Sequence, residues 1–221
     1  SGGELNLAVS QALATSAVSV GAGGTLSVAP AVAAEVAGLT LDPTGLVDLT
    51  SGRLVIGGDA TAGDLRAAII AGRAGGTWNG TTGITSSTAA ALGARGVGYV
   101  VRGDGSATVS FAAPGDTDLS GAVNVFDLVN INSSGKYGNA SASNWADGDM
   151  NYDGVTNVFD LVAVNGGGAY NQGNYLPAPP PASGSVAAVP EPTLFLPWAA
   201  AGIATACLIR RSQSGSANKH G

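Results

Sequence analysis

The sequence predicts a mainly β N-terminal region, which is either the end of a β-solenoid or a sandwich. A small all-α pair of loop–helix motifs and a C-terminal transmembrane helix are predicted to follow. Short apolar–polar alternations fill residues 1–60, one twelve-residue pattern occurs twice between Asp116 and Asp160, and an apolar run covers 193–209. The 221 residues include 35 glycines, 10 prolines and only 11% charged residues, which favours stacked strands with tight turns over a compact cytosolic enzyme.

Residues 1–60 contain short runs in which apolar and polar side chains alternate, as in half-buried β-strands. Gly23-Gly24, Pro43-Thr44-Gly45 and Ser51-Gly52 separate these runs and are typical of turns. Such regular spacing suits both solenoids and sandwiches, and the scarcity of aromatic residues favours the solenoid. The predicted strands are Leu5–Val9, Val18–Val20, Leu26–Val28, Leu39–Leu41, Val47–Leu49 and Leu54–Ile56.

Residues 61–112 interrupt the strand pattern with helical signals. Residues 61–71 are predicted to form a short helix, because Thr61 can cap it and Asp64 suits its first turn. A second helical turn is predicted over Thr88–Leu92. The segments predicted to form a hairpin after it are Val97–Val101 and Ala107–Phe111.

Two phrases of this region resemble known secreted proteins. Gly24–Val28 resembles the autotransporter-associated β-strand repeats of secreted bacterial proteins, and the phrase from Trp78 to Ser87 is similar to a segment of secreted planctomycete proteins. Trp78 itself has two interpretations. It either covers the end of the β-core or offers a flat platform on which a sugar can stack.

The duplicated twelve-residue pattern carries the clearest chemistry in the chain. Its copies begin at Asp116 and, 33 residues later, at Asp149, and each has glycine at position 6. Oxygen side chains fall at positions 1, 3, 5, 9 and 12, which is the spacing of a calcium loop of EF-hand type. The candidate ligands, including the position-7 carbonyls, are Asp116, Asp118, Ser120, Ala122, Asn124 and Asp127, then Asp149, Asn151, Asp153, Val155, Asn157 and Asp160.

Calcium is a hard cation that takes six to eight oxygen ligands, so the sequence predicts two bound calcium ions. The charge distribution agrees with this prediction. Seven acids and one base lie between Pro114 and Tyr175, which accounts for the entire net charge of −6. Such a cluster repels itself without a cation, so folding and metal binding are expected to be linked.

The paired loops closely resemble the type I dockerin family over residues 115–166. The family pattern of calcium ligands continues into a helix that carries Leu128 in the first copy and Leu161 in the second. The resemblance implies two loop–helix motifs and a cohesin-like protein as docking partner. The alternative is a pair of surface turns rich in Asp, Asn and Gly within a repeat protein.

The residues that follow the position-9 Asn define the candidate partner-binding surface. Dockerins contact their partner there, often with Ser-Thr, whereas this chain has Val125-Phe126 and Val158-Phe159. One side chain of each pair either packs in the core or forms part of a twofold-repeated apolar surface.

The C-terminal residues resemble a PEP-CTERM sorting signal. The segment has the motif Pro190, Glu191, Pro192, then the apolar run 193–209, then Arg210 and Arg211. The run is predicted to insert in a membrane with the arginines on the cytoplasmic side, and the resemblance implies recognition by an exosortase-type sorting enzyme. The alternative is a buried helix of a globular domain.

The chain lacks the residues that several classes of function need. His220, the single histidine, lies in the tail, so no Ser-His-Asp arrangement is expected within the fold. The lone cysteine, Cys207, excludes an intrachain disulfide. The chain has no basic stripe with interleaved aromatic residues, so nothing in it indicates nucleic-acid binding. We therefore predict no catalytic residues and no organic cofactor.

The sequence thus predicts a non-catalytic extracellular surface or matrix protein, held in the cell envelope at least transiently by its C-terminal helix. The alternative is the C-terminal part of a secreted polysaccharide-degrading glycoside hydrolase. Calcium could also serve only to stiffen the chain, without a protein partner. The predicted parts are a β-rich stem at 1–112, a dockerin-like domain at 113–175, a Pro-rich linker at 176–188, a sorting signal at 189–211 and a tail at 212–221.

Overall fold

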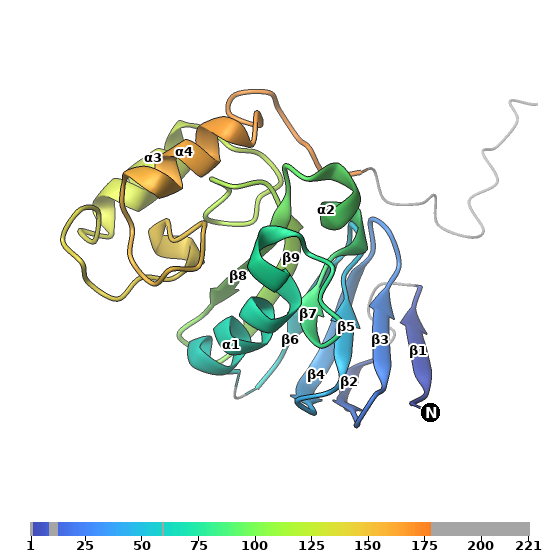
Figure 1. Ribbon diagram of the computed structural model, residues 1–221. Helices are drawn as coiled ribbons and strands as arrows, with labels where there is room; N and C mark the ends of the chain where they lie inside the picture. The colour runs from blue at the N-terminus through green and yellow to red at the C-terminus, as the bar shows by residue number, and fades with distance from the viewer. Residues whose placement is uncertain (1, 9–12, 59, 178–221) are drawn as a thin grey trace, which may run out of the picture. The chain divides into compact units, whose positions relative to one another are not determined.

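The computed structural model describes residues 2–8, 13–58 and 60–177 (Figure 1). All of them belong to one compact unit, Ser1–Pro180. The predicted sorting motif Pro190-Glu191-Pro192, the membrane segment 193–209 and the arginines that follow lie outside the described residues. Within the described ranges, no helix has the length and apolar character that crossing a membrane requires.

Two sheets form the larger part of this unit. The first sheet is entirely parallel, and Glu4, Thr25 and Leu46 occupy equivalent places on successive strands at intervals of 21 residues. Its strands, in spatial order, are β1 (Glu4–Leu7), β3 (Thr25–Val28), β5 (Leu46–Asp48) and β7 (Gly83–Thr85).

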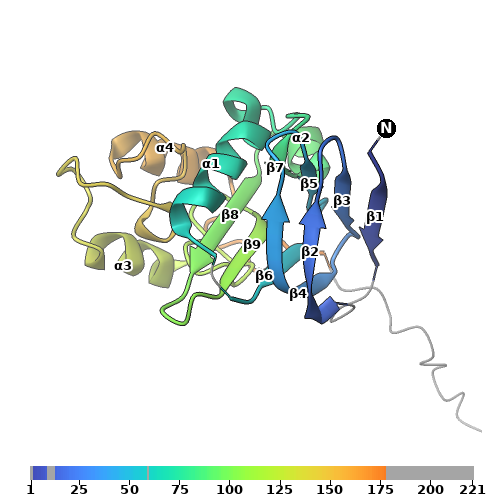
Figure 2. The ribbon, with the colours of Figure 1, turned by 90° about the horizontal axis from the view of Figure 1, so that it is seen from below.

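The second sheet is mixed, because three parallel strands are extended by an antiparallel hairpin. Its strands, in spatial order, are β2 (Leu13–Val20), β4 (Ala33–Leu41), β6 (Arg53–Ile56), β9 (Ala107–Ala112) and β8 (Gly96–Val101). β1 and β8 lie at opposite ends of the array of strands (Figure 2). The buried side chains of both sheets belong to one hydrophobic core, in which Leu26, Val47 and Leu54 have no solvent exposure. Burial of each such side chain contributes about 1.5–3 kcal/mol.

Two helices lie between strands in the chain order. α1 (Ala62–Arg73) joins β6 to β7, and α2 (Ser87–Leu92) joins β7 to β8. As predicted, Thr61 caps α1 by accepting a hydrogen bond from the Asp64 amide at 3.1 Å. α1 packs closely on β7 because residue 72 is glycine: a Cβ there would lie 2.0 Å from the Ile84 carbonyl oxygen.

The predicted fold class is wrong. The chain is not a mainly β region followed by an all-α part, since it forms an α/β fold in which helices are interleaved with parallel and mixed sheets. The individual strand and helix segments were largely predicted, but their pairing was not. The three-residue strand β7 is buried along its whole length and shows no alternation, so it was missed, and with it the place of α1 between β6 of one sheet and β7 of the other.

The last part of the unit contains α3 (Val125–Ser133), a 3-10 helix (Trp145–Asp147) and α4 (Val158–Gly166). α3 and α4 lie at the end of the unit away from β1 in both views (Figures 1 and 2). Isolated parallel bridges join Val123 to Tyr170 and Tyr137 to Thr156. Each bridge therefore links one copy of the repeat to the segment that follows the helix of the other copy.

An aromatic cluster fixes these loops to the sheets. The Tyr152 ring stacks on Tyr99 at a centroid distance of 6.3 Å, meets Trp78 edge-on at 6.3 Å and lies 5.8 Å from Trp145. Its hydroxyl donates to the Val97 carbonyl of β8. Trp78 is 6% exposed, so it covers the core and offers no open platform for a sugar.

Candidate metal centre

The first loop folds around the carboxylate of Asp116. This side chain is fully buried, and its two oxygens accept hydrogen bonds from the amides of Ser120 and Gly121, each at 2.9 Å. Positive φ angles at Leu119 (58°) and Gly121 (92°) turn the backbone inward, and glycine tolerates this conformation without strain. The sequence motif thus produces a tight loop around its first residue.

Three carboxylates converge in this loop. Ligand oxygens of Asp116, Asp118 and Asp127 all lie within 4.8 Å of one another. Two oxygens on opposite sides of a calcium ion, each at about 2.3–2.6 Å, are about 5 Å apart, so one ion can contact all three. The Ser120 hydroxyl, 3.2 Å from the Ala122 carbonyl oxygen, lies in the same loop and adds neutral oxygens to the set.

The second loop repeats the backbone of the first. Tyr152 and Gly154 have φ angles of 63° and 93°, close to those of their counterparts, and the Gly154 amide donates to Asp149 Oδ2 at 3.0 Å. Asn151 Nδ2 donates to Asp153 Oδ2 at 2.9 Å, so these two side chains are paired with each other. Among the described residues, only the first loop brings three carboxylates within 4.8 Å.

One atom of the second loop is left without a partner. Asp149 is fully buried, and its Oδ1 has no hydrogen bond to any part of the chain that the structure describes. A buried carboxylate oxygen without a donor or a cation costs several kilocalories per mole, so such atoms are rare in folded proteins. The oxygen at position 1 is the first predicted metal ligand, and a bound cation would satisfy it.

Positions 9 and 12 of each loop serve as helix caps. The side-chain oxygens of Asn124 and Asn157 accept from the amides of Phe126 and Phe159, each at 2.8 Å. Asp127 and Asp160 complete a capping box at the start of α3 and α4. Their Oδ2 atoms accept hydrogen bonds from the backbone N–H groups of Asn124 and Asn157, respectively. Asp127 also belongs to the carboxylate cluster, whereas Asn124 is oriented by the helix that it caps.

Two residues outside the repeats contact the position-1 carboxylates. The Tyr175 hydroxyl donates to Asp116 Oδ2 at 2.5 Å. Arg66 of α1 lies 3.6 Å from Asp149 Oδ2. The backbone of the first loop is also fixed from outside, because the Trp145 indole nitrogen donates to the Asp116 carbonyl at 2.7 Å. Nothing in the repeat pattern indicates these partners, since they come from distant parts of the sequence.

Burial changes the acidity of both position-1 side chains. It raises the pKa of Asp116 and that of Asp149 to about 6, from the ordinary value of 3.8. In each case desolvation of the charged form is the largest cause, and hydrogen bonds to the carboxylate oppose it in part. A bound cation would therefore stabilise the ionised form of both carboxylates, which burial otherwise disfavours.

The sign of the pH dependence should therefore differ with and without calcium. The folded protein has the higher pKa, so these two groups stabilise it fully below pH 3.8 and lose that contribution as the pH rises through about 6. Calcium-free protein should have a lower melting temperature at about pH 6.5 than at about pH 4.5. A calcium ion bound to the ionised carboxylates, as the sequence predicts, would reverse that order. Thermal scans at both pH values check this, and the same trend in both conditions would contradict it.

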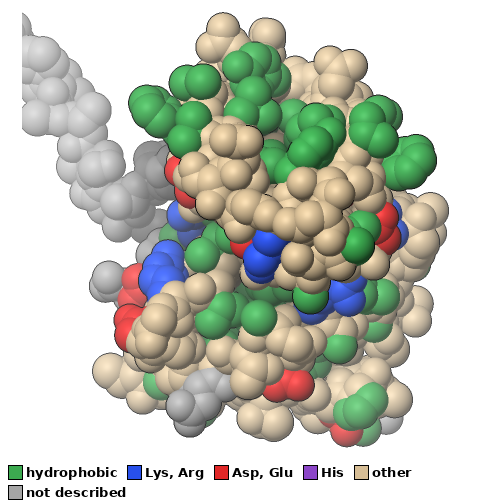
Figure 3. Space-filling model, turned by 90° about the vertical axis from the view of Figure 1, so that its left-hand side faces the viewer, with side chains coloured by type: hydrophobic (Ala, Val, Ile, Leu, Met, Phe, Trp, Pro, Cys, Tyr) green, Lys and Arg blue, Asp and Glu red, His purple; other side chains and the backbone are tan. Residues whose placement is uncertain are grey.

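The candidate partner-binding pairs are exposed. Val125 and Phe126 are 55% and 71% exposed, and Val158 and Phe159 are 55% and 68% exposed. The alternative in which one side chain of each pair packs in the core is therefore wrong. Val129 and Val162, one turn further along α3 and α4, extend the same face, and we call these six residues the apolar stripe. Hydrophobic side chains gather over this end of the molecule (Figure 3).

Comparisons of the chain with protein-family models, with curated proteins and with solved structures find no significant match.

Proposed function

We propose that residues 113–175 form a two-loop calcium-binding module that supports a protein-docking surface, in a protein without catalytic activity of its own. The observation that carries the proposal is the convergence of the carboxylates of Asp116, Asp118 and Asp127 within 4.8 Å. The unpartnered Asp149 Oδ1 of the second loop supports it independently. Oxygen-only ligand sets with several carboxylates suit calcium better than zinc or copper.

The two loops provide a direct test of this proposal. We expect Asp116→Ala and Asp149→Ala each to remove one bound calcium ion, because each substitution deletes the buried position-1 ligand. Titration calorimetry should show two ions bound per wild-type chain and one per variant. Asp104→Ala is the matched control, since Asp104 is an exposed turn residue whose carboxylate accepts from Ser106. A stoichiometry of two in every protein, or of none in the wild type, would count against the assignment.

The apolar stripe is the proposed docking surface, with a cohesin-like protein as the partner that the dockerin resemblance implies. The stripe supports this because Phe126 and Phe159 occupy equivalent places on two helices and are both exposed. Monomeric proteins seldom expose several large apolar side chains together without a partner. Since the pattern is repeated, either helix could present it to the partner.

We therefore expect either Phe126 or Phe159 to support some partner binding when the other is removed. In a pull-down from the native envelope fraction, Phe126→Ser and Phe159→Ser alone should each weaken the calcium-dependent capture of the partner protein by this chain. The double variant should abolish that capture. Both side chains are exposed, so the double variant should change the free energy of unfolding by no more than about 0.5 kcal/mol per site. Unchanged capture by a folded double variant would rule out the stripe as the docking surface.

Transport to the envelope through the sorting motif Pro190-Glu191-Pro192, the membrane segment 193–209 and the two arginines remains part of the proposal. It rests on the sequence pattern alone, because those residues lie outside the described ranges. An exosortase-type enzyme is the partner that this motif implies.

A further inference from the structure

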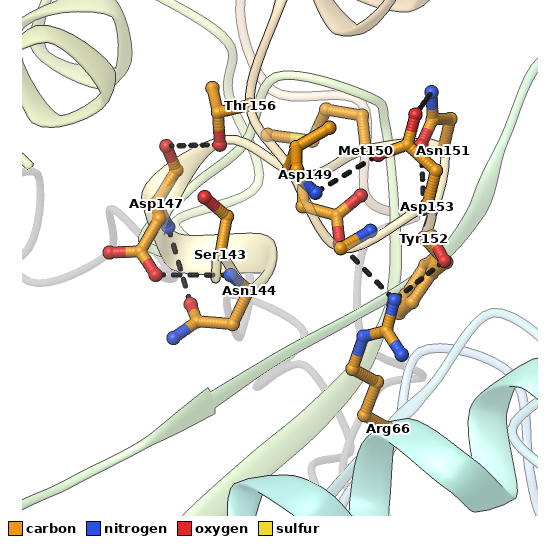
Figure 4. A network of polar contacts seen from close by, with 12 residues as sticks. Arg66, Ser143, Asn144, Asp147, Asp149, Met150, Asn151, Tyr152, Asp153 and Thr156 are labelled. Carbon is orange, nitrogen blue, oxygen red and sulfur yellow. Dashed lines mark hydrogen bonds and ion pairs between the residues drawn. The ribbon is translucent and has the colours of Figure 1, made fainter. Parts of the chain in front are cut away.

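Arg66 reaches from α1 into the second loop. Its Nη2 donates to the Tyr152 carbonyl at 2.7 Å and lies 3.6 Å from Asp149 Oδ2 (Figure 4). The guanidinium thus contacts two oxygens of the loop, one from a carboxylate and one from the backbone. Oxygens of these two kinds also ligate calcium. The Arg66 side chain is 29% exposed and that of Asp149 is fully buried, so bulk water screens the pair only in part.

Arg53 reaches the first loop in a similar way, since it donates to the Leu119 carbonyl, the counterpart of the Tyr152 carbonyl, at 2.8 Å. The group on the position-1 carboxylate of this loop, however, is neutral. There the Tyr175 hydroxyl donates to Asp116 Oδ2. The ion pairs of the described residues are Arg66–Asp149 and Lys136–Asp147, so neither involves Asp116. Arg95 lies 5.4 Å from the centroid of the Tyr175 ring, on an aromatic face and not on the carboxylate. The two loops therefore have nearly the same backbone and an arginine on the same carbonyl, and they differ in the group that contacts the position-1 carboxylate: a guanidinium at Asp149 and a hydroxyl at Asp116.

We propose that Arg66 makes the two calcium sites unequal: it acts as a tethered counter-charge that weakens calcium binding by the second loop and supports that loop when no metal is bound. This inference rests on the proposed calcium function and deepens it. Arg66 is a positioning residue, since it contacts the ligand Asp149 and does not need to contact the ion.

The expected effect of Arg66 follows from its charge. A calcium ion on the free Oδ1 of Asp149 would share that carboxylate with the guanidinium on Oδ2, and the two cations would repel each other across a few ångströms. Even at the dielectric constant of bulk water, this repulsion corresponds to an affinity loss on the order of tenfold. Without the ion, the same guanidinium offsets the negative charge of Asp149, so the second loop loses less when calcium is removed than the first loop does.

Calorimetry with calcium chloride can isolate each site. Asp118→Ala leaves only the second loop competent, and Asp153→Ala leaves only the first. Arg66→Met, which keeps a long side chain without charge, should tighten binding on the order of tenfold in the Asp118→Ala protein and change it less than twofold in the Asp153→Ala protein. Arg102→Met is the matched control, because Arg102 lies in the β8–β9 turn, where it contacts Thr108.

Arg66→Lys separates charge from packing. Lysine keeps the positive charge without the planar fork, so its effect on affinity should stay close to that of the wild type. Circular dichroism confirms that each variant is folded. Binding that is unchanged or weaker in the Arg66→Met, Asp118→Ala protein would overturn the inference. The absence of calcium binding in both single-loop proteins would instead overturn the proposed function.

Resistance to proteolysis provides a second readout. In calcium-free protein, Arg66→Met should expose the second loop to cleavage at a rate several-fold above that of the wild type, because the loop has lost its counter-charge. Cleavage in the first loop should not change. Equal cleavage rates in the second loop of both proteins would show that Arg66 does not support it.

Discussion

Removal of calcium is expected to lower the melting temperature of the protein by roughly 10–20 °C at neutral pH. A ligand at about 100 times its dissociation constant stabilises the folded state by about 2.7 kcal/mol per site, and two sites are proposed. For a domain of this size, each kilocalorie corresponds to about 2–4 °C. The structural reason lies in the position-1 carboxylates: Asp116 and Asp149 are both fully buried, and Asp149 Oδ1 has no partner among the described residues.

Thermal unfolding followed by circular dichroism, in millimolar calcium and in EDTA, measures this difference. Magnesium at the same concentration is the control, because it keeps its water shell and fits the loops less well. The Asp116→Ala, Asp149→Ala double variant should melt at the same temperature in calcium and in EDTA. A wild-type melting temperature that is insensitive to calcium would contradict the account.

Trp145→Ala is expected to destabilise the protein by about 3–5 kcal/mol, the usual effect of deleting a large buried aromatic side chain. Trp145 is 1% exposed, packs against Tyr152 and donates to the Asp116 carbonyl. The substitution would open a cavity between the loops and β8 and leave that carbonyl without its donor. The close packing is evident at Gly98, where a Cβ would lie 2.5 Å from the Trp145 ring.

Denaturant unfolding of the calcium-loaded protein measures the loss. Tyr137→Ala is the control, because Tyr137 is also an aromatic residue of the segment between α3 and α4 but is 44% exposed. We also expect the Trp145→Ala protein to bind calcium more weakly at the first loop, since Asp116 loses the contact that fixes its backbone. A loss no larger than that of Tyr137→Ala would show that Trp145 does not join the loops to the sheets.

Local elements could be predicted from the sequence where local chemistry determines them. The cap formed by Thr61 predicted α1, and alternation predicted six of the parallel strands. The loop spacing predicted the turn at Gly121 and its equivalent at Gly154. These features depend on neighbouring residues, and the sequence displays them directly.

The pairing of these elements depended on contacts between distant residues. Strand β7 is short and buried on both faces, so no alternation of apolar and polar residues indicated it. Strands β1 to β6 alternate between the two sheets along the chain, which allows the pairing within each sheet to be parallel, and no single segment of the sequence shows this order. The partners of the position-1 carboxylates, Arg66 and Tyr175, were missed for the same reason, since they lie outside the loops that they support.

The two loops and their helices belong to the same compact unit as the sheets and do not form a separate domain. Arg53 of β6 donates to the Leu119 carbonyl, and Arg95 donates to the Gly167 carbonyl, at 2.8 Å and 2.7 Å. With the aromatic cluster around Tyr152, these bonds join both loops to the α/β core. A docking surface on α3 and α4 would thus be held in a fixed orientation relative to the sheets.

The most direct test of the central claim is a crystal structure of the protein grown in calcium, with anomalous diffraction data. The account predicts two calcium peaks, each about 2.3–2.6 Å from a carboxylate oxygen at position 1 of a loop, Asp116 in the first and Asp149 in the second. Map peaks at neither loop, in crystals that contain millimolar calcium, would contradict it.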